Sequence, residues 1–188
     1  ILVFSWKDIF DFDSALVDYD LGFTMYHPLV ALKAFGTSAI SDFSIGDLLI
    51  GRQVGGIGST FGLGLIVGGI YLILRGFIRW EISVSFLVGI LVSATLFHLV
   101  DPTRFAGPIF HLLTGYTLIG AFFLATEDSS SPVNFIPMLI YGAVGGIVTV
   151  IIRNIGAYAD GVVYAILVIN MVNPLLDKIR PKALGKVA

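Results

Sequence analysis

The sequence contains no cysteine, which excludes disulfide bonds, thiolate metal sites and cysteine-ligated iron–sulfur clusters within it. Charged residues are also scarce: they make up 13% of the 188 residues, about half the share of roughly 25% in globular domains. The net charge of −2 leaves no broad basic surface for nucleic acid. Walker loops, dinucleotide fingerprints and nucleophile elbows are missing too, which argues against kinase or hydrolase chemistry of the soluble type.

Apolar residues, in contrast, make up 56% of the sequence and gather in long runs free of Asp, Glu, Lys and Arg. A membrane-spanning helix needs about 20 such residues. Four runs are long enough, and a fifth becomes so if it extends back across Asp160. The sequence therefore predicts an all-α membrane protein with about five transmembrane helices. The runs are 53–74, 82–100, 105–126, 129–152 and 161–176.

The predicted organisation has three parts. Residues 1–57 carry most of the acidic residues and no long apolar run, so we expect an extracytoplasmic or interfacial segment there. Residues 58–178 form the predicted five-helix repeat, and residues 179–188 a basic cytoplasmic tail. Glycines spaced four apart predict close helix crossings. We expect Gly64, Gly68, Gly142 and Gly146 to make such crossings with other chains or partner subunits.

Polar side chains inside membrane helices are costly and are therefore the first candidates for an ion path. His98 and His111 lie in the second and third runs, where a neutral histidine bonded to a backbone carbonyl is the structural alternative. No carboxylate stands next to either histidine in the sequence, so the pair is a poor candidate for a metal site.

Three further ion-path candidates belong to the fifth run. Asp160 stands at its mouth, seven residues after Arg153, and either attracts a cation or forms a local ion pair with that arginine. Asn170 and Asn173 share one helix face and precede Pro174. This spacing predicts a polar stripe that ends at a helix break, and broken helices line ion and substrate paths.

Three segments of the sequence resemble segments of one known protein family, and they follow one another in the same order as in that family. They are 118–126 (LIGAFFLAT), 152–162 (IRNIGAYADGV) and 164–177 (YAILVINMVNPLLD). Over about residues 55–177 the sequence resembles the RnfD/NqrB superfamily, whose members are membrane subunits of the Rnf electron-transport complex and of the sodium-pumping quinone reductase. The likeness is to the RnfD branch. The resemblance implies two five-helix repeats, of which this sequence matches the second.

The resemblance also implies FMN, attached by a phosphoester to a threonine in an outer-side motif similar to DxxTSATPLAxxK. The comparable stretch here is 20–33 (DLGFTMYHPLVALK), which keeps Pro28 and Lys33. His27 stands in place of the flavin-bearing threonine. A histidine cannot form this phosphoester, so we expect no covalent FMN on His27; Thr24 is the nearby hydroxyl. The candidate cofactor-binding residues are Thr24, His27 and Pro28.

The implied role is that of a membrane subunit in a complex that couples electron flow between ferredoxin and NAD to sodium or proton movement. Other membrane and flavoprotein subunits would be its partners, in the plasma (inner) membrane of a bacterium or archaeon. Two alternatives stay open. One is a channel or transporter-like subunit without a redox cofactor, which His27 favours, and the other is a scaffold that only packs against redox partners.

Basic residues in short loops predict which side of the membrane each end occupies. Three lie near the runs on the side of residues 1–57, and six lie on the side of the C-terminus. We therefore predict a cytoplasmic C-terminus. A C-terminal reporter enzyme that works only in the periplasm should be silent, and a strong signal from it would contradict this orientation. The three basic residues on the side of residues 1–57 are Arg52, Arg104 and Arg153. The six on the side of the C-terminus are Arg75, Arg79, Lys178, Arg180, Lys182 and Lys186.

Overall fold

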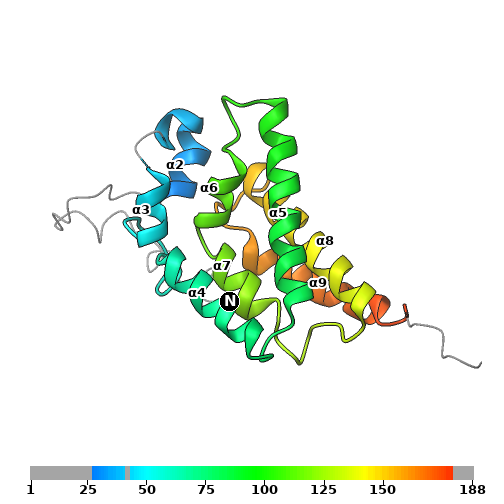
Figure 1. Ribbon diagram of the computed structural model, residues 1–188. Helices are drawn as coiled ribbons and strands as arrows, with labels where there is room; N and C mark the ends of the chain where they lie inside the picture. The colour runs from blue at the N-terminus through cyan, green and yellow to red at the C-terminus, as the bar shows by residue number, and fades with distance from the viewer. Residues whose placement is uncertain (1–26, 41–42, 180–188) are drawn as a thin grey trace, which may run out of the picture.

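The computed structural model describes residues 27–40 and 43–179, which form helices and short connections without any β-strand (Figure 1). The predicted all-α class is confirmed for this part of the chain, and Thr24 lies outside it. The helices are α2 (Pro28–Phe35), the 3₁₀ helix η2 (Gly36–Ile40), α3 (Ile45–Ile50), α4 (Gly62–Leu74), α5 (Trp80–Val100), α6 (Pro108–Leu113), α7 (Thr117–Ile119), the π-helix η3 (Gly120–Leu124), α8 (Phe135–Asn154) and α9 (Val162–Leu176).

Two of the predicted spans are helices of full membrane length. Helix α5 has 21 residues and α8 has 20, and both are strongly apolar. At 1.5 Å per residue each reaches about 30 Å, the thickness of the hydrocarbon core. Helices α4 and α9 have 13 and 15 residues. They reach only about 20–23 Å by the same rise, so length alone does not make them spanning helices.

The third predicted span is not one continuous helix. Helix α6 ends at Leu113, Thr114 is extended, and Gly115 has φ +66° before the chain turns into α7 and η3. A left-handed backbone angle favours glycine, which has no Cβ to clash. Hydropathy counts apolar residues but does not register this break, and therefore the run 105–126 resembles a single span by composition.

The helix break expected near Pro174 is also not where the sequence placed it. Helix α9 continues through Pro174 and ends at Leu176. A proline inside a helix removes one backbone hydrogen bond and crowds the preceding turn. The lost bond is the one that residue 174 would donate to the carbonyl four positions earlier, and the helix continues for two residues beyond it.

The packing of α5 against α8 forms the centre of the fold, and glycines allow the close approach. A Cβ on Gly142 would lie 2.6 Å from the Ile82 carbonyl oxygen, and one on Gly146 would lie 2.3 Å from that of Phe86. The predicted close crossing is thus confirmed, but for Gly142 and Gly146 it lies within the chain. The expectation of an intermolecular crossing through these two glycines is wrong. Gly68, on α4, has no atom within 4 Å of its Cβ position.

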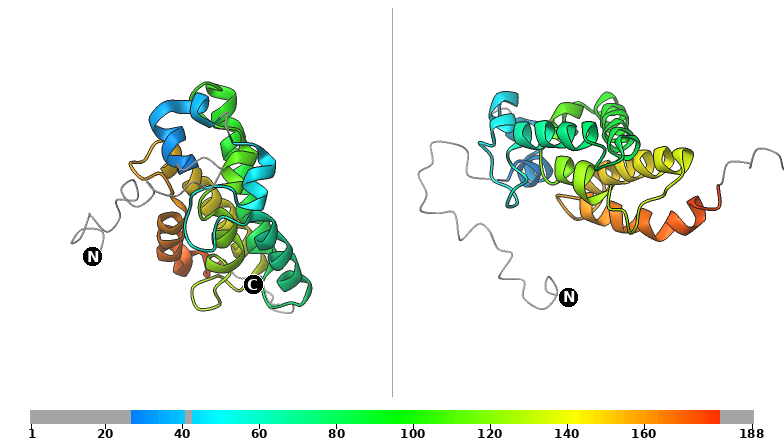
Figure 2. Two further views of the ribbon diagram at one scale, coloured as in Figure 1. Left: turned by 90° about the vertical axis from the view of Figure 1, so that its left-hand side faces the viewer. Right: turned by 60° about the horizontal axis from the view of Figure 1, so that its bottom comes forward.

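Helices α2 and α3 pack on the other side of the broken helix. Leu29 and Leu32 of α2 and Leu48 of α3 share a buried cluster with Phe110 and Leu113 of α6. In the views of Figures 1 and 2, α2 and α3 lie at the end of the molecule away from the last turn of α9. The motif region around Pro28 is therefore held against α6 by apolar burial.

The glycine contacts make a direct prediction for stability. Gly146→Ala should destabilise the fold by about 1–3 kcal/mol, because its methyl group would overlap the backbone of α5. Gly68→Ala is the matched control: it adds the same group on a helix where nothing lies within 4 Å. Thermal unfolding midpoints of the detergent-solubilised proteins compare the two. Equal midpoints for both variants would show that α5 and α8 do not pack this closely.

Candidate functional site at a broken helix

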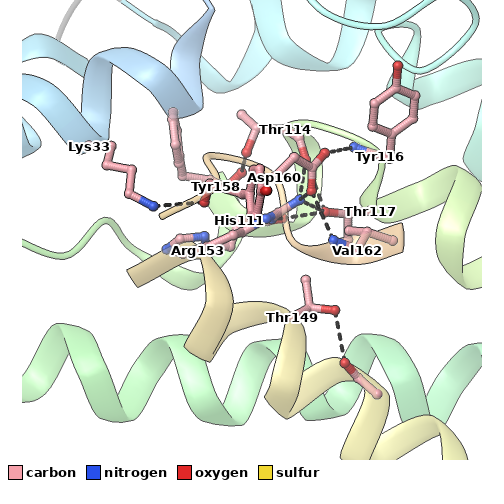
Figure 3. A network of polar contacts seen from close by, with 12 residues as sticks. Lys33, His111, Thr114, Tyr116, Thr117, Thr149, Arg153, Tyr158, Asp160 and Val162 are labelled. Carbon is pink, nitrogen blue, oxygen red and sulfur yellow. Dashed lines mark hydrogen bonds and ion pairs between the residues drawn. The ribbon is translucent and has the colours of Figure 1, made fainter. Parts of the chain in front are cut away.

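Arg153, in the last turn of α8, reaches into the break between α6 and α7. Its side chain is 1% exposed. The Nη1 atom donates to the carbonyl oxygen of His111 at 2.8 Å, and Nη2 donates to Thr117 Oγ1 at 2.8 Å and to the Thr114 carbonyl at 3.3 Å. Figure 3 shows the side chain among these groups. The guanidinium thus joins the Thr117 hydroxyl in donating to the carbonyls of His111 and Thr114, which lack helical partners at the break.

Asp160, in the connection between α8 and α9, completes the site. Its Oδ1 lies 2.9 Å from Nη2 of Arg153 and accepts the backbone N–H of Val162 at 3.2 Å. Its Oδ2 accepts the N–H of Tyr116 at 2.6 Å. Burial raises the pKa of Asp160, but Arg153 and the two N–H groups outweigh burial and hold the pKa below its usual range. The carboxylate is therefore ionised at neutral pH.

The two charges complement the ends of the helices around them. The guanidinium lies at the C-terminal end of α6, where carbonyls carry partial negative charge, and Asp160 accepts N–H groups at the starts of α7 and α9. Gly115 makes the arrangement sterically feasible. A Cβ on it would lie 2.3 Å from Asp160 Oδ2 and 2.9 Å from Arg153 Nη2.

A cavity of about 220 Å³ adjoins the site, and all the charged residues in its lining are basic. Lys33, Arg104 and Arg153 contribute to its wall, with no acidic residue among the described lining residues. Lys33 Nζ also donates to the carbonyl oxygens of Gly156 and of Tyr158, the latter at 2.7 Å. The cavity therefore carries positive charge. Its lining consists of Leu29, Leu32, Lys33, Arg104, Phe105, Arg153, Asn154, Ile155, Gly156 and Ala159.

Two buried donors beside the cavity have no hydrogen-bond acceptor within the described part of the chain. They are Nε of Arg153 and Nδ2 of Asn154. A buried donor without an acceptor costs about 1–3 kcal/mol, and most such groups in proteins find a partner. Water or a bound anion in the cavity would supply the missing acceptor.

His27 of the flavin motif lies close to this site. His27 precedes α2, its Nδ1 is buried without a partner among the described residues, and Pro28 is the buried first residue of the helix. Burial lowers the pKa of His27, while Asp160 acts to raise it and Arg153 to lower it further. His27 is therefore neutral at physiological pH and within electrostatic range of the Arg153–Asp160 pair.

The two histidines of the predicted spans have different surroundings. His98 Nδ1 lies 2.8 Å from the Phe105 carbonyl oxygen, which is the carbonyl-bonded arrangement expected of a structural histidine. His111 is fully buried, and neither ring nitrogen has a partner in the described part of the chain. Within that part there is also no group of three metal-ligating side chains.

The asparagines of α9 contact other parts of the chain. Asn170 accepts a hydrogen bond from the Tyr141 hydroxyl of α8, and Asn173 Nδ2 donates to the Ser130 carbonyl oxygen at 2.7 Å. Of the predicted ion-path residues, the structure brings Asp160 and His111 together at Arg153. It gives His98, Asn170 and Asn173 separate hydrogen-bond partners.

Sequence reasoning missed the role of the broken helix. Thr114, Gly115 and Thr117 form it, and Lys33 and Arg104 line the cavity beside it. One signal was available, because a threonine and a glycine interrupt the third apolar run. The convergence of the basic residues came only from the fold, since Lys33 and Arg153 lie 120 positions apart.

Comparison of the sequence with known proteins identifies its family. Residues 1–185 match the NQR2, RnfD, RnfE family. The chain belongs to this family. The resemblance inferred from the segments around Arg153 and Asp160 is thereby confirmed, and with it the membrane character of the chain.

Curated relatives in this family are named as the D-type subunit of an ion-translocating oxidoreductase complex. The protein of Pectobacterium carotovorum is 40% identical over 139 residues, which is 73% of this chain and 40% of that protein. The protein of Cronobacter sakazakii is 38% identical over 160 residues (82% and 46%). That of Aeromonas hydrophila is 37% identical over 166 residues (87% and 47%). The chain spans less than half the length of these relatives.

The buried ion pair predicts unequal effects for two similar substitutions. Asp160→Asn should destabilise the fold by about 3–5 kcal/mol, because Arg153 would stay buried without its counter-charge. Asp47→Asn is the control, because Asp47 pairs with Arg52 at 3.5 Å on the surface, where an ion pair contributes at most about 1 kcal/mol. Unfolding of detergent-solubilised protein measures both. A loss at Asp160 no larger than at Asp47 would contradict the buried pair.

Proposed function

We propose that this chain is a membrane subunit of a redox-driven ion-translocating complex of the Rnf type. The support comes from its membership of the family, from the names of its relatives and from two helices of membrane length. In this proposal the complex lies in the plasma membrane, with the C-terminus in the cytoplasm and the cavity toward the outside. Other membrane and flavoprotein subunits surround the chain.

The proposed contribution of the chain is one five-segment repeat. Its segments are α4, α5, the broken helix α6–α7–η3, α8 and α9, in the order of the predicted spans. Helices α4 and α9 expose large apolar side chains, including Val67 and Leu74 on α4 and Leu167 and Met171 on α9. Such side chains suit lipid or the helices of a partner subunit. A partner would also cover the ends that the short helices leave within the membrane.

We further propose that FMN binds this chain without a covalent bond, with its phosphate in the basic cavity. Lys33, Arg104 and the free Nε of Arg153 are suitable donors for a phosphate, because charge-assisted hydrogen bonds are the strong ones. The cavity is smaller than the roughly 300–1,000 Å³ of ordinary ligand sites. It therefore suits the phosphate end alone, and the flavin ring would lie outside it. Bound FMN would supply one- and two-electron transfer.

A channel or transporter-like subunit without a cofactor is the second candidate. The observation that favours it is the broken helix, since irregular backbone at membrane depth lines a cavity or packs within protein. Histidine at position 27 favours it as well. The basic cavity next to the motif region favours the redox proposal instead, since a cation channel gains nothing from three basic residues there.

The flavin proposal predicts non-covalent FMN. The peptide 20–33 should carry no FMN mass, and this chain should not fluoresce in a denaturing gel. Denaturing the intact complex should release the FMN. Arg104→Gln should weaken FMN retention roughly tenfold, because a charged hydrogen bond contributes about 1.5–3 kcal/mol. Arg52→Gln removes an exposed arginine outside the cavity and serves as the control. Covalent FMN on the peptide, or equal retention in both variants, would refute the proposal.

A further inference from the structure

Four oxygen atoms from four residues converge on the guanidinium of Arg153. They are the carbonyl oxygens of His111 and Thr114, the hydroxyl of Thr117 and Oδ1 of Asp160, all 2.8–3.3 Å from Nη1 or Nη2. Carbonyls at the end of a half-helix, joined by a hydroxyl and one carboxylate, are the ligands that coordinate sodium in discontinuous membrane helices. Here a side-chain cation of the protein fills the position that a metal cation would take.

We propose that the break between α6 and α7 is a latent alkali-cation site, and that the guanidinium of Arg153 occupies it and keeps sodium and potassium out. The guanidinium is charged at every physiological pH, so a change of pH does not remove its charge. It is also attached to the rigid end of α8. A dissolved cation would have to displace a tethered one that already bonds all four oxygens.

The planar shape of arginine explains why this residue and not lysine fills the site. Nη1 bonds the His111 carbonyl, while Nη2 reaches Thr114, Thr117 and Asp160. A lysine ammonium is a compact point charge that cannot span both sets of oxygens from one position. Arg153→Lys should therefore preserve the positive charge at the break but lose some of the hydrogen bonds to the four oxygens.

The cavity beside Arg153 gives a dissolved cation access once the side chain is shortened. Arg153 forms part of the wall between the cavity and the break, and its Nε is buried without an acceptor among the described residues. Truncation at Cβ would connect the cavity to the oxygen cluster. The remaining Asp160 carboxylate would then favour a cation there, since it would have lost the guanidinium that neutralises it.

A tethered cation has a clear use in an ion-translocating complex. Such a complex conserves energy only if ions do not cross it without electron transfer. An open oxygen cluster inside a broken helix would offer them a place to bind, and Arg153 removes that place. The barrier role rests on the proposed function, whereas the latent cation site rests only on the contacts of Arg153.

The first test measures sodium leak. Intact complexes with Arg153→Ala are reconstituted into proteoliposomes, and uptake of radioactive sodium is followed without any electron donor. Uptake should rise by at least about tenfold over the natural protein, a change equivalent to about 1.4 kcal/mol. Arg52→Ala is the control, because it shortens an exposed arginine that belongs neither to the cavity nor to the oxygen cluster. The double variant Arg153→Ala, Asp160→Asn should leak less than the single one, because the carboxylate is gone.

The second test measures cation-dependent stability and needs no transport. Sodium, potassium or free guanidinium should raise the melting temperature of the Arg153→Ala complex, or restore its assembly, without a comparable effect on the natural complex or Arg52→Ala. Arg153→Ala complexes that show neither leak nor cation-dependent stability overturn the proposal, as does failure to assemble at any concentration of these ions. If cations stabilise the Arg153→Ala complex but it does not leak sodium, the barrier role is rejected and the latent cation site is kept. Cation-dependent stability of the Arg153→Ala complex, combined with no donor-driven ion transport by the natural complex, would reject the proposed function but not the site.

Discussion

The buried guanidinium of Arg153 bonds three parts of the chain to one another at the break in the helix. It closes the end of α6, it holds Thr117 at the start of α7, and through Asp160 it fixes the connection that leads into α9. A buried charge is tolerated only when its partners satisfy it, because an unpaired one would cost several kcal/mol. The geometry of the break therefore depends on this side chain and its partners.

The same connection links the broken helix to the flavin-motif region. Lys33 of α2 bonds the carbonyls of Gly156 and Tyr158, and His27 lies within electrostatic range of Asp160. The cavity between these elements shares Arg153 with the break. In the proposed function, the flavin ring lies outside the cavity, so a charge change on its reduction would act on Arg153 through space, across the phosphate end of the site. Coupling requires a local charge change of this kind that biases one of two arrangements.

The sequence predicted the features that depend on residues close to one another along the chain. Long uncharged runs predicted α5 and α8. For Asp160 the sequence left two alternatives open, a cation or a local pair with Arg153, and the structure contains the pair. The alternative of a carbonyl-bonded histidine was confirmed for His98. The five-segment repeat, the domain limits and the orientation stay predictions.

Other features depend on contacts between distant segments, which a pattern in one sequence does not contain. The glycines of α8 predicted a close crossing, but nothing in their spacing said that α5 of the same chain would be the partner. Hydropathy missed the break at Thr114 and Gly115, since both residues are compatible with an apolar helix by composition. The oxygen cluster around Arg153 appears only when three segments come together.

Hydrogen exchange in the intact complex tests the central role of Arg153 most directly. The Tyr116 amide lies at the break but donates to Asp160, which Arg153 holds in place. Its exchange should therefore be as slow as that of buried amides in α5, and much faster in an Arg153→Lys complex. Exchange of the Tyr116 amide in the natural protein at the rate of the exposed connection 127–131 would contradict the account.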